Sequence, residues 1–138
     1  MLARRVGPME LMPDVLDLLR SASICYLATT MPDGSPQVTQ VWVDTDGEDV
    51  LINTVEGHQK LRNVRRDPRV ALTVSDPARP TDYVQIRGEV REITTEGARE
   101  HIDDVSQKYL GKPYPHFGGG GQRVLLRIAP RRVSSPRG

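Results

Sequence analysis

The residues best suited to chemistry in this sequence form one basic stretch that follows a short apolar run. Ile52–Val55 has the composition of a strand end, and Gly57–Arg66 that of a short helix. Six basic side chains lie between positions 58 and 69, opposed only by Asp67: His58, Lys60, Arg62, Arg65, Arg66 and Arg69. Free backbone N–H groups and the helix dipole favour an anion where a strand leads into a helix. The stretch therefore predicts a site for a small anionic ligand; the alternative is a solvated helix face that binds nothing.

The overall charge argues against a nucleic-acid-binding protein. The chain has 138 residues with 19 Lys and Arg against 18 Asp and Glu, so its formal net charge is only +1. Nucleic-acid-binding domains carry a clear basic excess. Aromatic residues make up 4% of the chain, which leaves few stacking surfaces for single strands. The basic charge is local, as expected for a small anionic ligand.

Neither a metal site nor a membrane segment is predicted. The single cysteine, Cys25, lies in an apolar run and is expected to be a core thiol. His58, His101 and His116 are far apart in the sequence and have no zinc spacing. His101 lies beside an apolar stripe, where we expect a structural role. The basic N-terminus lacks the apolar core of a signal peptide, and no apolar run has membrane-spanning length, so we expect a cytoplasmic protein.

Hydrophobic periodicity and turn residues predict the elements that must position the basic stretch. Amphipathic helices are expected at Pro13–Ala22 and Glu96–Tyr109. Six strands are expected, at Ile24–Thr30, Gln37–Asp44, Asp49–Val55, Val70–Ser75, Tyr83–Ile93 and Arg123–Ile128. The first three follow one another across short turns, which predicts an antiparallel meander. The fold class is therefore mainly β with short helices, a six-stranded antiparallel barrel in a single domain over residues 1–138.

Three local features carry further expectations. Gly88 in the middle of a strand indicates a bulge or the close approach of another backbone. The four glycines Gly118–Gly121 are either a flexible lid or an inert connector, since they do not have the context of a phosphate loop. Residues 1–10 and 131–138 are expected to be loose termini.

Five stretches, taken in order, resemble the pyridoxamine-phosphate-oxidase-like split β-barrel proteins, and among them most the branch that uses the deazaflavin coenzyme F420. They are CYLATTMPDGSPQVTQVWVD at 25–44, GHQKLRNVRRDPRVAL at 57–72, VQIRGEVRE at 84–92, QKYLGKPYPHF at 107–117 and GQRVLLRIAPRRV at 121–133. Each stretch alone is a weak motif, whereas their order and spacing are specific and cover nearly the whole chain. The resemblance implies an FMN-binding-like split barrel that forms a homodimer, with two cofactor sites at the subunit interface.

The resemblance also implies a set of cofactor-binding residues. Grouped by the part of the cofactor that each would meet, they are Lys60 for the phosphate, with His58 and Gln59 beside it; Asn53, Thr54 and Val55 along the ring and ribityl chain; Gln37, Thr39, Gln40 and Val41 around the ring; and Tyr83, Gln85 and Arg87 from the partner subunit. His58 departs from the Arg or Ser expected at its position.

The implied function is an oxidoreductase that transfers a hydride from reduced deazaflavin to an electron-poor small molecule, such as an enone, a quinone or a tetrapyrrole. No catalytic side chain is assigned, because the sequence has no triad or paired carboxylates, and chemistry would come from the cofactor. The alternatives are an FMN-dependent enzyme of the same fold, a non-catalytic F420-binding or storage protein, and a regulatory or nucleic-acid-binding barrel.

The number of arginines after Lys60 favours the deazaflavin over FMN. One phosphate does not need Arg62, Arg65, Arg66 and Arg69 as well, and F420 carries an acidic oligoglutamate tail that such a surplus would attract. The alternative for each arginine is solvation or contact with a partner subunit.

Overall fold

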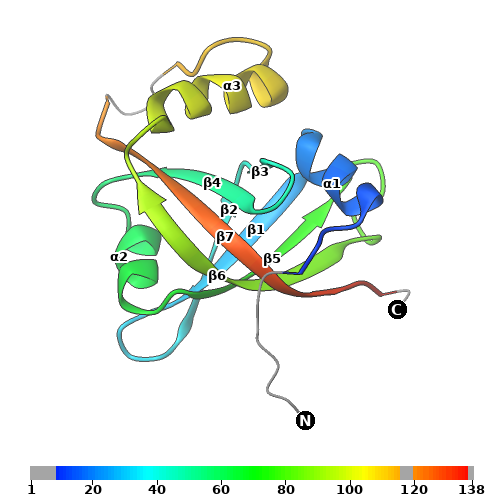
Figure 1. Ribbon diagram of the computed structural model, residues 1–138, viewed down its shortest axis with the longest axis horizontal. Coiled ribbons are helices and arrows are strands. Elements are labelled where there is room, and N and C mark those ends of the chain that lie inside the picture. The colour runs from blue at the N-terminus through cyan, green and yellow to red at the C-terminus, as the bar shows by residue number, and fades with distance from the viewer. Residues whose placement is uncertain (1–8, 116–119, 137–138) are drawn as a thin grey trace.

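Over residues 9–115 and 120–136, which the computed structural model describes, seven antiparallel strands form one curled sheet in the order β2-β1-β5-β6-β7-β4-β3 (Figure 1). The strands are β1 Ile24–Thr30, β2 Pro36–Val41, β3 Asp44–Thr45, β4 Val50–Val55, β5 Arg69–Ser75, β6 Val84–Thr94 and β7 Arg123–Ser134. The helices are α1 Pro13–Arg20, α2 Gln59–Arg66 and α3 Ala98–Leu110. The sheet curls into a half-barrel of the split-barrel type, which confirms the mainly β fold class.

The prediction of six strands is wrong, because the expected strand Gln37–Asp44 is split. β2 ends at Val41, and Asp44–Thr45 forms β3 on the opposite edge of the sheet, where it pairs with β4. Val43 between them is fully buried; its N–H donates to the Tyr109 hydroxyl over 3.2 Å, and its carbonyl accepts from Lys108 Nζ over 2.5 Å. Because α3 takes both backbone groups, this residue leaves the strand ladder. The two hairpins β1–β2 and β3–β4 form, but the continuous three-stranded meander does not.

The last strand is longer than the sequence predicts. β7 continues past Ile128 to Ser134 and pairs with β6 as far as Gln85, so the expectation of a loose tail is wrong for residues 131–134. The alternation of apolar residues stops before Pro130, so the sequence pattern does not predict this second half of the strand. The part of the other expected loose terminus before Met9 lies outside the described residues.

Gly88 explains how β7 accommodates its proline. The β6–β7 register shifts between Arg87 and Gly88, where Gly88 faces Pro130. A Cβ atom on Gly88 would lie 2.3 Å from the carbonyl oxygen of Ala129. The predicted bulge and close backbone approach are both confirmed at this position.

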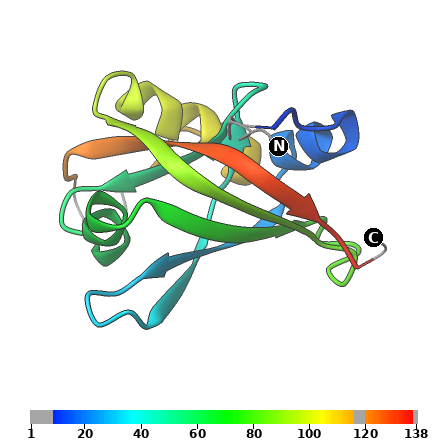
Figure 2. The same cartoon turned by 60° about the horizontal axis from the view of Figure 1, so that its bottom comes forward.

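The buried interior joins α1, α2 and the strands in one apolar cluster. Val15 and Leu19 of α1 and Leu61 and Val64 of α2 supply the helical part of this core. A smaller cluster of Leu51, Ala98 and Leu125 holds α3 against β4 and β7. Figure 2 shows α1 and α3 on one side of the sheet and the β1–β2 hairpin extending away from them. No helix in the described ranges is long and apolar enough to cross a membrane.

Candidate functional site

A pocket of about 510 Å³ lies between α3 and the barrel, beside the N-terminus of α2. Its lining comes from the start of β1, the end of β2, the middle of β4, α2, α3 and the first residue of β7: Ala22, Ser23, Ile24, Cys25, Gln40, Val41, Trp42, Asn53, Thr54, His58, Lys60, His101, Ile102, Val105, Tyr109, Tyr114 and Arg123. The curvature of the sheet brings these distant segments around one space. None of the described lining residues is Asp or Glu.

One end of the pocket is basic. Lys60 is half-buried in the first turn of α2, and the structure gives its ammonium no hydrogen bond or ion pair with any described residue. Burial, and then the charge of Arg123, lower the pKa of Lys60. The N-cap residue His58 forms no side-chain cap to α2; its Nδ1 lies 3.1 Å from the Thr54 hydroxyl oxygen instead. This end therefore offers an unpaired cation beside an uncapped helix N-terminus.

The surroundings of His58 favour its neutral form. Burial, followed by the charges of Lys60 and Arg123, lowers its pKa from the ordinary 6.5. A neutral imidazole has one N–H donor and one acceptor nitrogen. With Nδ1 at Thr54, the Nε2 atom is the one left to meet a ligand.

A second wall is a chain of polar side chains. Arg123 Nε donates to Asn53 Oδ1 over 2.9 Å, and Asn53 Nδ2 lies 3.1 Å from His101 Nδ1. His101 Nε2 lies 3.1 Å from Asp44 Oδ2. Although burial alone would raise the pKa of Asp44, hydrogen bonds from His101 and the Thr45 backbone and the charge of Lys108 lower it, so this residue stays ionised.

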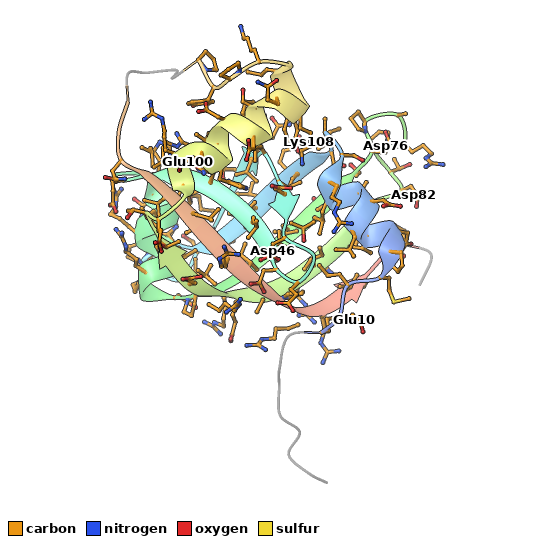
Figure 3. The ribbon with its side chains drawn as sticks, turned by 45° about the horizontal axis from the view of Figure 1, so that its top comes forward. Glu10, Asp46, Asp76, Asp82, Glu100 and Lys108 are labelled. Carbon is orange, nitrogen blue, oxygen red and sulfur yellow. The ribbon has the colours of Figure 1, made fainter. Side chains whose placement is uncertain are left out.

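A further, adjoining part of the wall is aromatic. Trp42 stacks on Tyr109 with ring centroids 5.0 Å apart and meets Tyr114 edge-on at 6.0 Å. The Tyr109 hydroxyl donates to the Ser23 carbonyl over 2.7 Å, and burial raises its pKa to about 12. Lys108, which lies where α3 meets the α1 side of the barrel (Figure 3), donates to the carbonyls of Leu19 and Val43. The wall is therefore fixed from behind and presents flat apolar surface to the pocket.

Cys25 lines the pocket but is poorly suited to nucleophilic chemistry. Burial raises the pKa of its thiol to about 12, with a smaller opposing effect from Lys108. The thiolate is the reactive form of cysteine. The expectation of a core thiol agrees with its complete burial.

Six of the thirteen predicted cofactor-binding residues line this pocket: Gln40, Val41, Asn53, Thr54, His58 and Lys60. Asn53 differs from expectation in one respect, since both ends of its side-chain amide are bonded within the protein. The cofactor roles of these six residues remain predictions.

Four predicted residues lie nearby without lining the pocket. Gln37 accepts from Thr29 and Asn63, so its side chain is part of a polar cluster behind α2. The Gln59 amide donates to Asn63 and accepts from Arg62. Thr39 is directed into the barrel, where its hydroxyl has no partner among the described residues. Val55 pairs with Arg123 across the β4–β7 ladder.

The three residues expected from a partner subunit lie on β6 or directly before it. Gln85 donates to the Ser134 hydroxyl over 3.1 Å. Tyr83 precedes β6 and is exposed, and Arg87 on β6 is exposed beside Ala71. None of the three lines the pocket of its own chain, so their expected role at a partner's site stays a prediction.

The surplus arginines of α2 and β5 do not extend the basic end of the pocket. Arg65 pairs with Glu56 over 2.6 Å and Arg69 with Asp67 over 2.8 Å. Arg66 donates to the Thr30 carbonyl, and Arg62 donates to the Gly57 carbonyl over 2.6 Å. Arg66 and Arg69 border a second, more open hollow of about 670 Å³ beside the β1–β2 hairpin. The arginine count therefore does not distinguish the deazaflavin from FMN.

Sequence reasoning missed five residues that shape the pocket: Trp42, His101, Tyr109, Tyr114 and Arg123. The helical stripe of α3 placed Tyr109 on its apolar face, and a structural role for His101 agrees with its two side-chain contacts. Nothing local to Arg123 marks it, because it reaches the pocket through the pairing of β7 with β4. His116 and the first half of the glycine run lie outside the described residues; Gly120 and Gly121 form coil before β7. In the described parts of the chain, no cluster of His, Cys, Asp or Glu could hold a metal ion.

Comparison with known proteins places this chain in a family. An F420 reductase of known structure is 31% identical, with 86% of this chain and 94% of that chain covered and a TM-score of 0.76. A conserved hypothetical protein from Mycobacterium tuberculosis is 28% identical over 97% of this chain and 89% of that chain, with a TM-score of 0.71. General Stress Protein 26 from Bacillus anthracis, at 16% identity, 86% and 88% coverage and a TM-score of 0.64, shares the fold alone.

The family model described as pyridoxamine 5'-phosphate oxidase matches residues 11–135, from two residues before α1 to just past the end of β7. The match includes every strand of the sheet and every element that lines the pocket. The chain belongs to the pyridoxamine 5'-phosphate oxidase family.

Proposed function

We propose that this protein is an oxidoreductase that uses reduced coenzyme F420 to reduce an electron-poor small molecule such as an enone, a quinone or a tetrapyrrole. The observation that carries the proposal is Lys60, an unpaired and half-buried cation at the uncapped start of α2, inside a pocket whose described lining has no carboxylate. The 31% identity to an F420 reductase favours the deazaflavin over other phosphorylated flavins.

The residues present fit such a cofactor. Lys60 and the first N–H groups of α2 would hold its phosphate, because a helix N-terminus and an ammonium both favour an anion. The Trp42–Tyr109 stack offers a flat apolar wall for a ring system. The space of about 510 Å³ falls within the usual range for small-molecule and cofactor pockets.

The bound deazaflavin would supply the hydride, and the protein would supply placement and electrostatics. Lys60 would fix the phosphate end, and Gln40 and Val41 on β2 would border the ring. The apolar side chains of Ile102 and Val105 on α3 would exclude water from this space. None of these roles requires a side chain to undergo redox chemistry.

The test is a comparison of the two cofactors on the purified protein. We expect tight binding of F420, measured by its absorbance and fluorescence changes, and oxidation of reduced F420 by at least one member of a panel of enones, quinones and biliverdin. Tight FMN binding together with undetectable F420 binding would overturn the proposal in favour of an FMN enzyme. Tight F420 binding without turnover on any acceptor would favour the storage protein.

A further inference from the structure

The basic end of the pocket holds a second cation whose charge has no carboxylate partner in the lining. Arg123, the first residue of β7, is half-buried there. Burial is the main cause of the lowered pKa of both Lys60 and His58, and the charge of Arg123 adds to it in each case. The three groups therefore face a common space and repel one another when protonated. A bound anion would relieve this repulsion.

A chain of hydrogen bonds sets the orientation of Arg123, and the donor and acceptor of each bond in it can be assigned. The Ala98 carbonyl can only accept, so the Asn53 atom 2.8 Å from it is the amide nitrogen. Asn53 Oδ1 is then left to accept from Arg123 Nε, and Asn53 Nδ2 also faces His101 Nδ1. His101 Nδ1 must accept, which places its proton on Nε2, where it donates to Asp44 Oδ2.

The guanidinium is held from its other side by an aromatic ring. Arg123 Cζ lies 5.0 Å from the centroid of Tyr114. Arg123 also has a side-chain hydrogen bond with Tyr114. The bonded groups of Asn53 and Tyr114 carry no carboxylate to pair the positive charge, and a guanidinium has five N–H donors, so donors remain for a ligand. A guanidinium in this state is suited to hold a phosphate through two parallel N–H bonds.

We infer that Arg123 is a second anion-binding residue, which shares the ligand's phosphate with Lys60, and that Asn53 and His101 are positioning residues that orient its guanidinium. The inference rests on the proposed function in one respect, namely that the ligand is a phosphorylated flavin or deazaflavin. It assigns a binding role to β7, far in sequence from the basic stretch around α2.

The test measures the preference for a phosphate rather than binding alone. Dissociation constants are compared within two pairs of ligands: FMN against riboflavin, which differ by the phosphate alone, and F420 against its ribityl deazaflavin core, which lacks both the phosphate and the oligoglutamate tail. We expect Arg123→Gln to weaken binding of the phosphorylated ligand of a pair by about ten- to a hundredfold, which is the range of one charge-assisted hydrogen bond. The affinity for the ligand without phosphate should stay unchanged. Arg123→Lys should retain part of the preference. Arg127→Gln is the matched control, because this β7 arginine pairs with Asp46 and Glu92 away from the pocket.

The positioning role is tested with Asn53→Asp, which keeps the size of the side chain. A carboxylate next to Arg123 would neutralise it, so the preference for the phosphorylated ligand should fall as in Arg123→Gln, whereas Asn53→Ala should show a smaller loss. Thermal unfolding of each variant monitors the fold. Equal weakening of both members of a pair by Arg123→Gln, or a full phosphate preference in Asn53→Asp, would overturn the inference.

A separate experiment tests the role of Arg123 if the proposed function is wrong. If the wild-type protein binds no flavin or deazaflavin, the ring signals of His58 in NMR spectra can be followed while inorganic phosphate is added. Shifts in the wild type that are lost in Arg123→Gln would support the anion-binding role, and shifts that persist in this variant would overturn it.

Discussion

Lys60 is the residue on which the proposed site depends most directly. A charge-assisted hydrogen bond contributes roughly 1.5–3 kcal/mol. We therefore expect Lys60→Ala to weaken cofactor binding by about ten- to a hundredfold, measured by fluorescence titration, while the thermal unfolding midpoint stays close to that of the wild type. Arg66→Ala is the comparison, since Arg66 borders the other hollow and should have a smaller effect on binding. Unchanged affinity in Lys60→Ala would refute its role.

We expect His58 to make ligand binding depend on pH. In the free protein its pKa lies below 6.5, because of burial and the neighbouring cations Lys60 and Arg123. A bound phosphate would offset those cations and raise this pKa, so binding would take up a proton. Affinity should therefore increase as the pH falls from about 8 towards about 6, the range in which a histidine changes charge.

The variant His58→Gln separates this effect from titration of the ligand itself. It should bind with an affinity that no longer follows pH in the same range. An affinity profile with the same slope in wild type and variant would show that another group titrates.

The same lowered pKa has a consequence for stability. The unfolded chain binds a proton at His58 near the ordinary pKa of 6.5, and the folded chain does so only at lower pH. The unfolded state therefore holds more protons in this window, and His58 reduces the stability of the free protein as the pH falls through it.

At the scale of elements, the paired strands β6 and β7 leave no room for a side chain at Gly88. We expect Gly88→Ala to destabilise the protein by about 1–3 kcal/mol, because the Ala129 carbonyl is backbone and cannot turn away from a Cβ atom at 2.3 Å. Urea unfolding measures the change. Gly120→Ala is the matched control, since a Cβ atom added to Gly120 would meet no atom within 4 Å. A Gly88→Ala variant as stable as this control would contradict the packing described for the two strands.

The elements that the sequence could predict are those whose signals are local. The turn at Pro32-Asp33-Gly34, the helix α1 and the start of β5 after Pro68 depend on residues a few positions apart. The break after Val41 could not be predicted in this way, because Val43 is removed from the ladder by Lys108 and Tyr109, more than sixty positions later in the chain. Local alternation continues through Trp42 and Val43, so the pattern indicates one long strand.

The residues of the candidate site also fall into those with a local sequence signal and those brought in by long-range contacts. Lys60 and His58 were predicted from a basic stretch and its neighbours in sequence, and both line the pocket. Arg123 and Tyr114 enter through the path of β7 and the loop before it, which depends on strand order. Asn53 also lines the pocket, but its bonds to Ala98 and Arg123 arise from tertiary packing.

At the scale of the whole molecule, the outer face of β1 and β2 is a surface suited to a second copy of the chain. Tyr26 and Val38 project from it with 44% and 63% of their surface exposed. Gln40, the register partner of Tyr26, also lines the pocket, so a molecule seated on this face would lie at the pocket mouth. The homodimer implied by the sequence resemblance would use this face and complete the site from both subunits.

We expect light scattering to show a dimer at micromolar concentration with cofactor present. Val38→Asp should produce monomers and weaken cofactor binding, because it places a charge in the proposed contact. Met12→Asp is the matched control, because Met12 is 62% exposed, much like Val38, and lies at the start of α1. This variant should remain dimeric. A monomeric wild-type protein under these conditions would rule out the dimer.

The position of β7 in the sheet affects how this protein is made in the cell. β7 lies between β6 and β4, and it is the last of the described strands to leave the ribosome. Until it emerges, β4 and β6 both present unpaired edges, and such edges are open to pairing with other chains. The nascent chain is therefore expected to be prone to aggregation until β7 inserts between β6 and β4, which are already synthesised. Chaperone binding during translation should be strongest in this interval and should fall once β7 has emerged.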